Sequence, residues 1–409
     1  MNICIFEDLF ISQLAPLNYL RHTSKLICGA DTLLEKIVNF FPAKTRLTLH
    51  TRKYLTPYLA EKFPKTNINE LSEGEYIFFN SRAVFNTDDL RSITKLFKKN
   101  KDTALLQDKV IIAFHLSDEK VRQYKEIINT EDDNLVSYAD IEWLGLNKIE
   151  SENSFRLINY PSDLILYLED QLNYDLNREM KGKKKLHIGK KCKIGKNVVF
   201  DTSQGKIYIN DNTIIEPFTY IKGPVYIGEN CTIRSGSQIY GPVRIGGSCK
   251  VSGEITSSIL HWYVNKQHYG FLGHSYLCEW VNLGAGTTTS NLKNNYSKIV
   301  LNIDDRKVDT NSIFLGSIIG DHTKTGIQTM LNTGTIVGIS SNLYGAGYHN
   351  KKIRSFSWED ATNNEVIAYE IDKAISTARI SMCRRNVNMT EAYEKMMRYV
   401  FEKKDENLI

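Results

Sequence analysis

Aliphatic residues recur at every sixth position through the middle of the chain. An α-helix repeats every 3.6 residues and a β-strand every two, so neither element alone produces a period of six. Short strands arranged as three flats per coil would turn each of these residues toward the inside of a triangular prism. The pattern therefore predicts a left-handed parallel β-helix. The uninterrupted run is Ile209, Ile215, Ile221, Ile227, Ile233, Ile239, Ile245 and Val251.

The same period extends in both directions from this run. Upstream it includes Ile188, Ile194 and Phe200, after which the phase slips by three residues around Gln204. Downstream the matching residues are Leu283, Ile319, Thr325, Leu331, Val337 and Leu343. We therefore expect a coil over residues 186–347. Residues 252–282 break the phase, and such a break usually marks a loop that projects from one face, often the binding face.

Apolar runs alternate with helical patterns in the part of the chain that precedes the coil. The helical patterns cover residues 31–40, 53–63, 87–99 and 118–129, and an apolar run precedes each of them. This alternation predicts a doubly wound α/β domain over residues 1–180, with a parallel sheet and helices on both faces. Ligands of such sheets bind beyond the carboxyl ends of the strands, where Glu7, Asp8 and residues 80–82 would lie. Neither GxGxxG nor GxxxxGK(S/T) occurs, so no common phosphate loop marks the place.

The last part of the chain, residues 358–409, predicts a helical cap. Ile367, Ile371 and Ile375 follow a helical spacing within a first helix at 360–383, and a second helix is expected at 390–404. We expect both helices to cover the open end of the coil.

Composition excludes several classes of protein. The 409 residues, 42% of them hydrophobic, suffice for about two or three globular domains, and no apolar run is long enough to cross a membrane. The net charge of +5 is thinly spread apart from the lysines of residues 181–191. No aromatic residues interleave with these lysines, so we interpret them as a solvated linker and expect no nucleic-acid partner. Seven cysteines without a CxxC pair, and no secretory leader, predict reduced thiols in the cytoplasm.

Chemistry-bearing residues gather around the phase break. Gly273-His274-Ser275-Tyr276 is followed by Asn282-Leu283-Gly284-Ala285-Gly286-Thr287 and then by Asn291. This order resembles the acetyltransferase half of the bifunctional family that makes UDP-N-acetylglucosamine, and the whole chain is similar to the Bacteroidetes-type variant of that family. The resemblance is strong over about residues 250–350 and weak before residue 180.

The resemblance implies a set of roles in acetyl transfer. Amide formation from an amine and a thioester needs a base near neutral pH, and His274 would be that base. The backbone N–H of Ala285 would stabilise the oxyanion. Asn282 and Asn291 would hydrogen-bond the sugar or the cofactor, and Tyr276 would help to hold the sugar phosphate. The lysine that binds this phosphate in the better-known family is replaced by Thr256, and Arg234 matches a family arginine only loosely. Lys266 could supply the cation instead.

The resemblance also implies nucleotidyl transfer in the N-terminal domain. Uridyltransferases of this class open with a glycine-rich loop that is absent here. Arg21, Lys25 and Arg82 could still bind a nucleoside triphosphate, and Asp8 or Asp163 could hold Mg²⁺. Alternatively, these residues are surface charges on a degenerate domain.

We therefore expect a bifunctional enzyme. The coil would transfer acetyl from acetyl-CoA to an amino-sugar phosphate such as glucosamine-1-phosphate, and the N-terminal domain would transfer a nucleotidyl group to the sugar phosphate. Coils of this kind generally form trimers that share the cofactor site. Three alternatives remain: an acetyltransferase with a degenerate N-terminal domain, a trimeric scaffold that binds sugar nucleotides without catalysis, and a zinc carbonic anhydrase. The last would need three converging histidines, and His261, His268 and His274 lack the spacing of that family.

Overall fold

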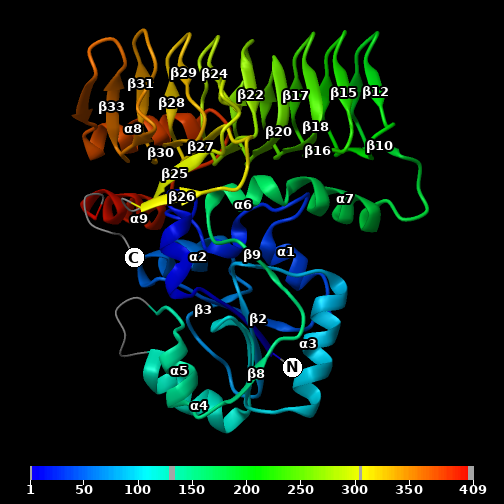
Figure 1. The fold of residues 1–409 in the computed structure, drawn as a ribbon, viewed down its shortest axis with the longest axis vertical. Helices are drawn as coiled ribbons and strands as arrows, with labels where there is room; N and C mark the ends of the chain where they lie inside the picture. Colours follow the sequence, from blue (N-terminus) through cyan, green and yellow to red (C-terminus); the bar gives the residue numbers. More distant parts are fainter. Residues whose placement is uncertain (1, 129–133, 304–305, 404–409) are drawn as a thin grey trace.

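The chain folds into a sheet domain and a long β-helix that lie side by side (Figure 1). The structure is a computed structural model that describes residues 2–128, 134–303 and 306–403. Helices α6 (Pro161–Leu166) and α7 (Leu168–Glu179) lie between the two units, and α8 (Ile371–Cys383) and α9 (Glu391–Glu402) lie toward the last coils. No helix in the described ranges has the length and apolar character needed to cross a membrane.

The N-terminal domain is built around one mixed sheet with the strand order β3-β2-β1-β4-β7-β6-β8. β1, β2, β3 and β4 are parallel, as predicted, but β7 runs antiparallel to both β4 and β6. The reason is a tight turn at Asp108 and Lys109, whose φ angles are both positive, so the chain returns as a hairpin instead of crossing over through a helix. The strands are β1 (Asn2–Phe6), β2 (Arg46–His50), β3 (Asn67–Ile68), β4 (Tyr76–Asn80), β6 (Thr103–Gln107), β7 (Val110–Leu116) and β8 (Asn147–Glu150), with β5 (Ala83–Val84) paired separately to β9 (Arg156–Leu157).

The helices of this domain match the predicted positions closely. Residue 129 of the predicted fourth helix lies outside the described residues, as does residue 404 of the last. The helices are η1 (Leu9–Leu14), η2 (Thr23–Lys25), α1 (Leu33–Val38), η3 (Lys53–Leu55), α2 (Thr56–Lys62), α3 (Thr87–Lys99), α4 (Asp118–Ile128) and α5 (Tyr138–Trp143).

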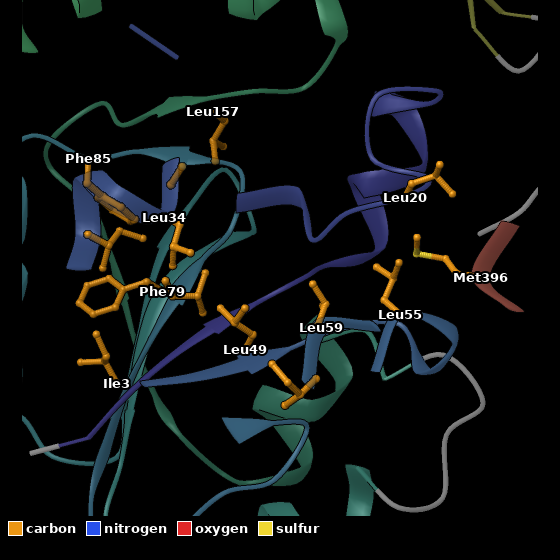
Figure 2. Packing of buried hydrophobic residues seen from close by; sticks show 14 of the residues in the cluster. Ile3, Leu20, Leu34, Leu49, Leu55, Leu59, Phe79, Phe85, Leu157 and Met396 are labelled. Atoms are coloured by element: carbon orange, nitrogen blue, oxygen red, sulfur yellow. The ribbon is translucent and has the colours of Figure 1, made fainter. Parts of the chain in front are cut away.

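The C-terminal helices pack on the sheet domain as well as on the coil. Figure 2 shows Met396 of α9 beside Leu55 and Leu20 in the core of the N-terminal domain. The rings of Tyr54 and Tyr399 stack with centroids 4.5 Å apart. We expected these helices to cover the open end of the coil, but their apolar faces instead join the two units. The segment that starts at residue 358 also begins with strands, because β33 (Ser357–Asp360) and β34 (Glu365–Ala368) form an antiparallel pair before α8.

The coil is a β-helix with three flats, as the hexads predict. The inner flat faces the sheet domain and contains β10 (Leu186–Ile188), β13 (Ile207–Ile209), β16 (Val225–Ile227), β23 (Tyr276–Leu277), β27 (Ser317–Ile319), β30 (Thr335–Val337), β32 (Lys352–Ile353) and the second halves of β18 (Gln238–Ile245) and β20 (Glu254–Leu260). The outer flat contains β11 (Lys193–Ile194), β14 (Ile214–Ile215), β17 (Thr232–Ile233), β19 (Lys250–Val251), β21 (Asn265–Lys266), β28 (Lys324–Thr325), β31 (Asn342–Tyr344) and β33. The third flat contains β12 (Val199–Asp201), β15 (Tyr220–Lys222), β22 (Phe271–Gly273), β24 (Thr288–Thr289), β29 (Met330–Leu331) and the first halves of β18 and β20.

The predicted aliphatic ladder fills the inside of the prism. Its members from Ile209 to Leu343 form one buried cluster, apart from Thr325. Ile188 and Ile194 belong to the first coil and remain 41% and 38% exposed, because no further coil covers them. The predicted three-residue shift of the phase is present. The full coil from Leu186 to its partner Ile207 is half a hexad longer than the next coil, from Ile207 to Val225.

The phase break is not the projecting loop that we expected. Within residues 252–282 the coil continues, but its corners are shorter. Lys250 pairs with Asn265, and Glu254 pairs with Phe271. These partners lie closer in sequence than the three hexads that separate partners in a regular coil. The segment that leaves the coil is residues 291–316, which carries the antiparallel pair β25 (Val300–Ile303) and β26 (Arg306–Asp309). The six-residue phase is therefore lost because the corners become shorter. The insertion at residues 291–316, in contrast, leaves the hexads before and after it in the same phase.

The inner flat is buried under the sheet domain. Its outward-facing residues Arg244, Ile259, Tyr276 and Ile318 are all buried, and α6 and α7 pack against its strands. Ile259, Tyr276 and Ile318 share a hydrophobic cluster with the leucines of α7. The sheet domain and the coil therefore form one continuous interior.

Candidate active sites

His274 lies at the corner where the third flat turns into the inner flat. Its backbone has a positive φ of 48°, its N–H donates to Thr256 O, and its carbonyl accepts the N–H of Gly316. A corner residue in this conformation directs its side chain away from both flats. We call residues 273–275 the histidine corner.

Two side chains from the inserted segment hold the imidazole of His274. Asn291 Nδ2 lies 2.9 Å from His274 Nδ1, and the Phe314 ring stacks on the imidazole with centroids 5.0 Å apart. Burial lowers the pKa of His274 to about 4, so the ring is neutral at physiological pH. The sequence predicted roles for both His274 and Asn291. It did not predict a role for Phe314, because this residue follows the β25–β26 hairpin and its return to the histidine corner cannot be inferred from spacing.

The orientation of the Asn291 amide decides which imidazole nitrogen can accept a proton. If Nδ2 donates to Nδ1, the single proton of the neutral ring is on Nε2. If the amide is flipped, so that its oxygen and nitrogen exchange places, Oδ1 accepts from Nδ1–H and the Nε2 lone pair becomes free. Only the flipped amide makes Nε2 a base.

The second candidate group lies at the other end of the third flat, at the corner where the outer flat turns into it. The Gly284 N–H donates to Thr325 Oγ1, and the Gly286 N–H donates to Tyr269 O. In the described part of the chain, the Ala285 N–H between them donates to no protein acceptor. We call residues 284–286 the alanine corner; its middle amide is available for a ligand.

Within one chain, the structure does not bring the two corners together. Tyr269, whose carbonyl accepts the N–H of Gly286, precedes the short strand β22, and His274 follows it. Five residues at about 3.3 Å each separate the corners by roughly 15 Å. One chain alone therefore cannot place both groups on one thioester.

The other predicted binding residues of the coil are already engaged. Tyr276 is fully buried, and its hydroxyl bonds to Ile27 N and to His261 Nε2. Lys266 replaces an aliphatic ladder residue inside the coil, where its ammonium donates to Ser252 O and His268 O. Burial lowers the pKa of Lys266 to about 8.

Asn282 and Arg234 also lie apart from the histidine corner. Asn282 lies on the outer flat and accepts a hydrogen bond from Asn265. Arg234 pairs with Glu216 at 2.9 Å at the surface of an earlier coil.

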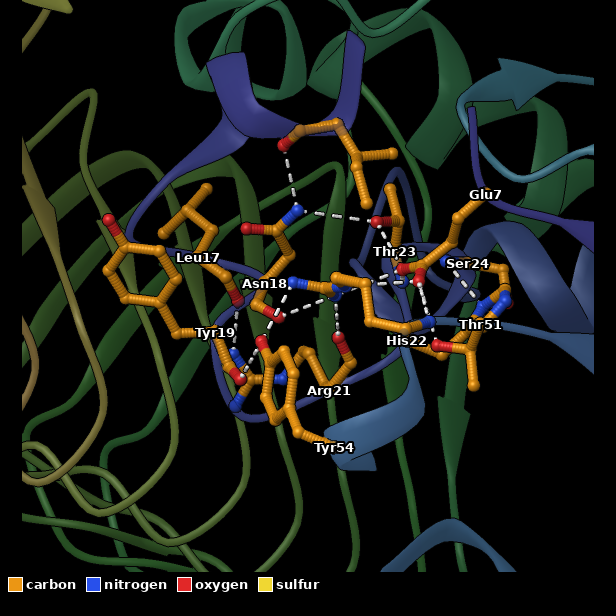
Figure 3. A network of polar contacts seen from close by, with 12 residues as sticks. Glu7, Leu17, Asn18, Tyr19, Arg21, His22, Thr23, Ser24, Thr51 and Tyr54 are labelled. Atoms are coloured by element: carbon orange, nitrogen blue, oxygen red, sulfur yellow. Dashed lines mark hydrogen bonds and ion pairs between the residues drawn. The ribbon is translucent and has the colours of Figure 1, made fainter. Parts of the chain in front are cut away.

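In the N-terminal domain, two of the three predicted nucleotide ligands form buried ion pairs. Arg21 pairs with Asp321 of the coil, and Arg82 pairs with Asp8 at 2.7 Å. Figure 3 shows the neighbouring network at the strand ends, in which the carboxylate of Glu7 accepts from Thr23 and Thr51. Arg52 completes this network with an ion pair to Glu7 at 3.0 Å. The carboxyl edge of the sheet is therefore filled by the side chains of the chain itself.

The proposed metal ligands do not form a cation site in this arrangement. Both oxygens of Asp8 accept from Arg82, and Asn80 donates to one of them. Asp163 accepts the backbone N–H groups of Asn159 and Tyr160 at the start of α6. Among the described residues, no group of three or more His, Cys, Asp or Glu is placed to bind a metal ion.

Lys25 is the predicted nucleotide ligand that faces a cavity. The cavity has a volume of about 410 Å³ and lies where α2, the coil and the C-terminal helices meet. The ammonium of Lys25 lies 5.4 Å from the centre of the Phe63 ring. We call this cavity the junction pocket; sequence analysis could not find it, because its walls come from three distant segments.

Comparison with protein families finds one match in each unit. Residues 3–184 match the family model described as sugar nucleotidyl transferase. Residues 206–241 match the model described as bacterial transferase hexapeptide, with six repeats.

Individual relatives cover a smaller part of the chain. A bifunctional sugar-1-phosphate nucleotidylyltransferase/acetyltransferase of Sulfurisphaera tokodaii is 31% identical over 37% of this chain and 38% of its own length. The bifunctional protein GlmU of Methanococcus aeolicus is 39% identical over 37% of this chain and 36% of its own length. These matches thus span well under half of the relatives. The UDP-N-acetylglucosamine acyltransferase structure from Francisella novicida is 13% identical over 55% of this chain and 87% of that chain, with a TM-score of 0.32.

Proposed function

Because the chain joins a sugar nucleotidyl transferase domain to a hexapeptide-repeat coil, we propose that it is a bifunctional sugar-nucleotide enzyme. The coil transfers acetyl from acetyl-CoA to an amino-sugar phosphate, with glucosamine-1-phosphate as the first candidate. The N-terminal domain transfers a nucleotidyl group to the sugar-1-phosphate. The seven cysteines are free thiols, which supports a cytoplasmic location.

The observation that carries the acetyl transfer is the His274–Asn291 pair at the histidine corner. Asn291 orients the imidazole, and Phe314 shields one of its faces from water. A neutral imidazole held by a second polar group is the usual arrangement of a general base. With the Asn291 amide flipped, Nε2 removes the proton that the amine loses as it forms the amide bond.

The free amide of Ala285 supports a site for the thioester. Acetyl-CoA supplies the acetyl group as a thioester when it is bound. The Ala285 N–H, which has no protein acceptor in the described part of the chain, is the donor suited to the negative charge that develops on the carbonyl oxygen. The other product is the free thiol of coenzyme A, which takes up the proton released by His274.

A second copy of the chain would unite the two corners. Exposed apolar side chains surround the alanine corner, including Tyr269, Ile327 and Tyr348, and Ile327 is 74% exposed. Apolar residues gathered in this way are typical of an interface. In the proposed trimer, the histidine corner of one copy lies against the alanine corner of the next.

Nucleotidyl transfer is supported by the family match over residues 3–184. In this reaction the sugar phosphate attacks the α-phosphate of a nucleoside triphosphate and pyrophosphate leaves. One observation favours the second candidate, an enzyme with acetyl transfer alone: Arg21 and Arg82 are committed to internal ion pairs.

The proposal is tested by measuring both products separately. The protein is incubated with acetyl-CoA, glucosamine-1-phosphate, UTP and Mg²⁺, and free thiol and pyrophosphate are recorded. His274→Ala should reduce thiol release at least about 100-fold, since general bases contribute about that much. Pyrophosphate release from supplied N-acetylglucosamine-1-phosphate should remain unchanged.

His187→Ala is the matched control, since this histidine lies on the first coil and stacks on Tyr208. Light scattering of both variants should give a trimer of the 46.9 kDa chain. Full thiol release by His274→Ala would reject the base, and a monomeric wild type with full activity would reject the shared site. Pyrophosphate absent in the wild type would leave acetyl transfer alone, and an absence of both products, with no binding of acetyl-CoA in calorimetry, would favour the scaffold.

A further inference from the structure

The junction pocket has the size and lining of a site for a small molecule. Its volume of about 410 Å³ falls within the range of about 300–1,000 Å³ that is usual for such sites. It is closed on three sides by α2, by the coil corner at residues 262–263 and 279–280, and by the segment between α8 and α9. Since each wall comes from a different part of the chain, the pocket exists only in the assembled protein.

Flat aromatic rings form much of the wall. Trp262, Tyr263, Trp280 and Tyr393 all line the pocket. The rings of Tyr263 and Trp280 stack face to face, with centroids 4.0 Å apart and planes within 3°. A rigid stack of this kind offers a planar face on which a heterocyclic base can stack.

Opposite charges face each other across the pocket. Glu279 has a side chain that is only 17% exposed, and Nδ1 of the neutral His261 lies 3.8 Å from its carboxylate. Burial alone would lower the pKa of Lys62 and raise that of Glu279, yet both pKa values move the other way because each charge stabilises the other. Lys62 also donates to the Tyr58 hydroxyl at 2.9 Å, and the ammonium of Lys25 lies over the ring of Phe63, the residue that follows α2.

This combination matches one chemical class of ligand. A buried carboxylate accepts hydrogen bonds from ring N–H groups, aromatic rings stack on a planar base, and two lysines attract phosphate. We propose that the junction pocket binds a nucleotide, with the base against the aromatic wall and Glu279, and the phosphate toward Lys25 and Lys62. The site goes beyond the proposed function, because it lies between the two units rather than at the strand ends of the sheet.

Binding is tested with UMP in the absence of Mg²⁺ and sugar phosphate. Trp262 and Trp280 are two of the four tryptophans of the chain, so a stacked base should quench the intrinsic fluorescence. Calorimetry should give a single site, and Lys62→Gln should weaken binding at least tenfold. Lys65→Gln is the matched control, an exposed lysine just beyond α2, and should bind as the wild type does.

Glu279→Gln tests the other end of the ligand. The amide removes the charge while keeping the shape, and we expect UMP to bind at least threefold more weakly. Glu254→Gln, on an exposed part of the third flat, should have no effect.

The proposal is overturned if neither UMP nor GMP binds, or if binding is the same in Lys62→Gln and the wild type. Binding of glucosamine-1-phosphate in place of UMP would likewise overturn it, since the ligand would then be a sugar phosphate. Nucleotide binding that depends on Lys62, without pyrophosphate release in the earlier assay, would uphold the pocket and reject nucleotidyl transfer.

Discussion

Two buried histidines of the coil are held neutral by their surroundings. His261 and His322 each bond to a tyrosine hydroxyl through Nε2, and Nδ1 of each has no hydrogen-bond partner among the described residues. Burial lowers the pKa of both to about 3. The unfolded chain takes up these protons near pH 6.5, whereas the folded chain resists them until about pH 3. Acid therefore favours the unfolded chain between these two values.

His261→Gln should make stability less sensitive to acid. The free energy of unfolding of the wild type should fall as the pH drops from 6.5 to 4.5, and each such histidine contributes about 1.4 kcal/mol per pH unit. Replacing His261 removes one of these contributions, so the slope should flatten by about that amount. Denaturant titrations at several pH values measure the slope, and an unchanged slope would contradict the prediction. His187→Gln should keep the slope of the wild type.

At the residue scale, the sequence identified contacts only where spacing determined them. His274 and Asn291 lie on consecutive coils and hydrogen-bond as neighbours. The pairing of Arg21 with Asp321 was beyond the sequence, because it joins residues 300 positions apart across two units. Tyr276 was expected to hold a ligand, yet it is buried because the outward side of the inner flat faces a domain instead of solvent.

The inserted segment at 291–316 shapes the histidine corner. It begins at Asn291 and returns at Phe314, so both ends of one insertion contact the same imidazole. Its apolar residues Ile299 and Leu301 are buried in the cluster shared by the coil and the sheet domain. A strand pair anchored in this way holds the two contact residues in place.

Phe314→Ala should change the pH profile of acetyl transfer. The ring is 37% exposed, so its loss should cost little stability, but it would let water reach His274. The pKa of His274 should then rise from about 4 toward its ordinary value, and the acid limb of kcat/KM should move up by about one unit or more. Phe218→Ala, on a distant corner, should leave the limb in place. A limb that stays in place in Phe314→Ala would show that the ring does not shield the base.

At the element scale, periodicity predicted the coil well and its interruption poorly. A period of six survives as long as every corner has the same length, and the corners between Val251 and Leu283 are shorter. The insertion, in contrast, spans a whole number of hexads, so Leu283 and Ile319 keep the same phase on either side of it. The hexad period therefore reveals a change in corner length, but it does not reveal a loop inserted between two hexads.

Across the whole molecule, Arg21 and Asp321 connect the two units through a buried ion pair. Asp321 also accepts the N–H of Glu279, and both charged side chains are almost entirely buried. Asp321→Asn would leave the guanidinium without its counter-charge, a change that costs about 3–5 kcal/mol in comparable buried pairs. Denaturant unfolding should show this loss. Glu142→Gln, which breaks an exposed pair with Lys148, should change stability by less than about 1 kcal/mol. An equal decrease in the free energy of unfolding of the two variants would show that the buried pair contributes no more to stability than the exposed pair.

The burial of the inner flat limits how copies can assemble. A prism has three sides, and this chain has already covered one of them with its own sheet domain. In the proposed trimer, three copies would meet along their third flats, between the histidine and alanine corners. Their sheet domains would then point outward from the trimer axis. In this arrangement the proposed acetyl transfer would take place near the axis and the proposed nucleotidyl transfer at the periphery, so the product of the first reaction would diffuse through solvent to the second site.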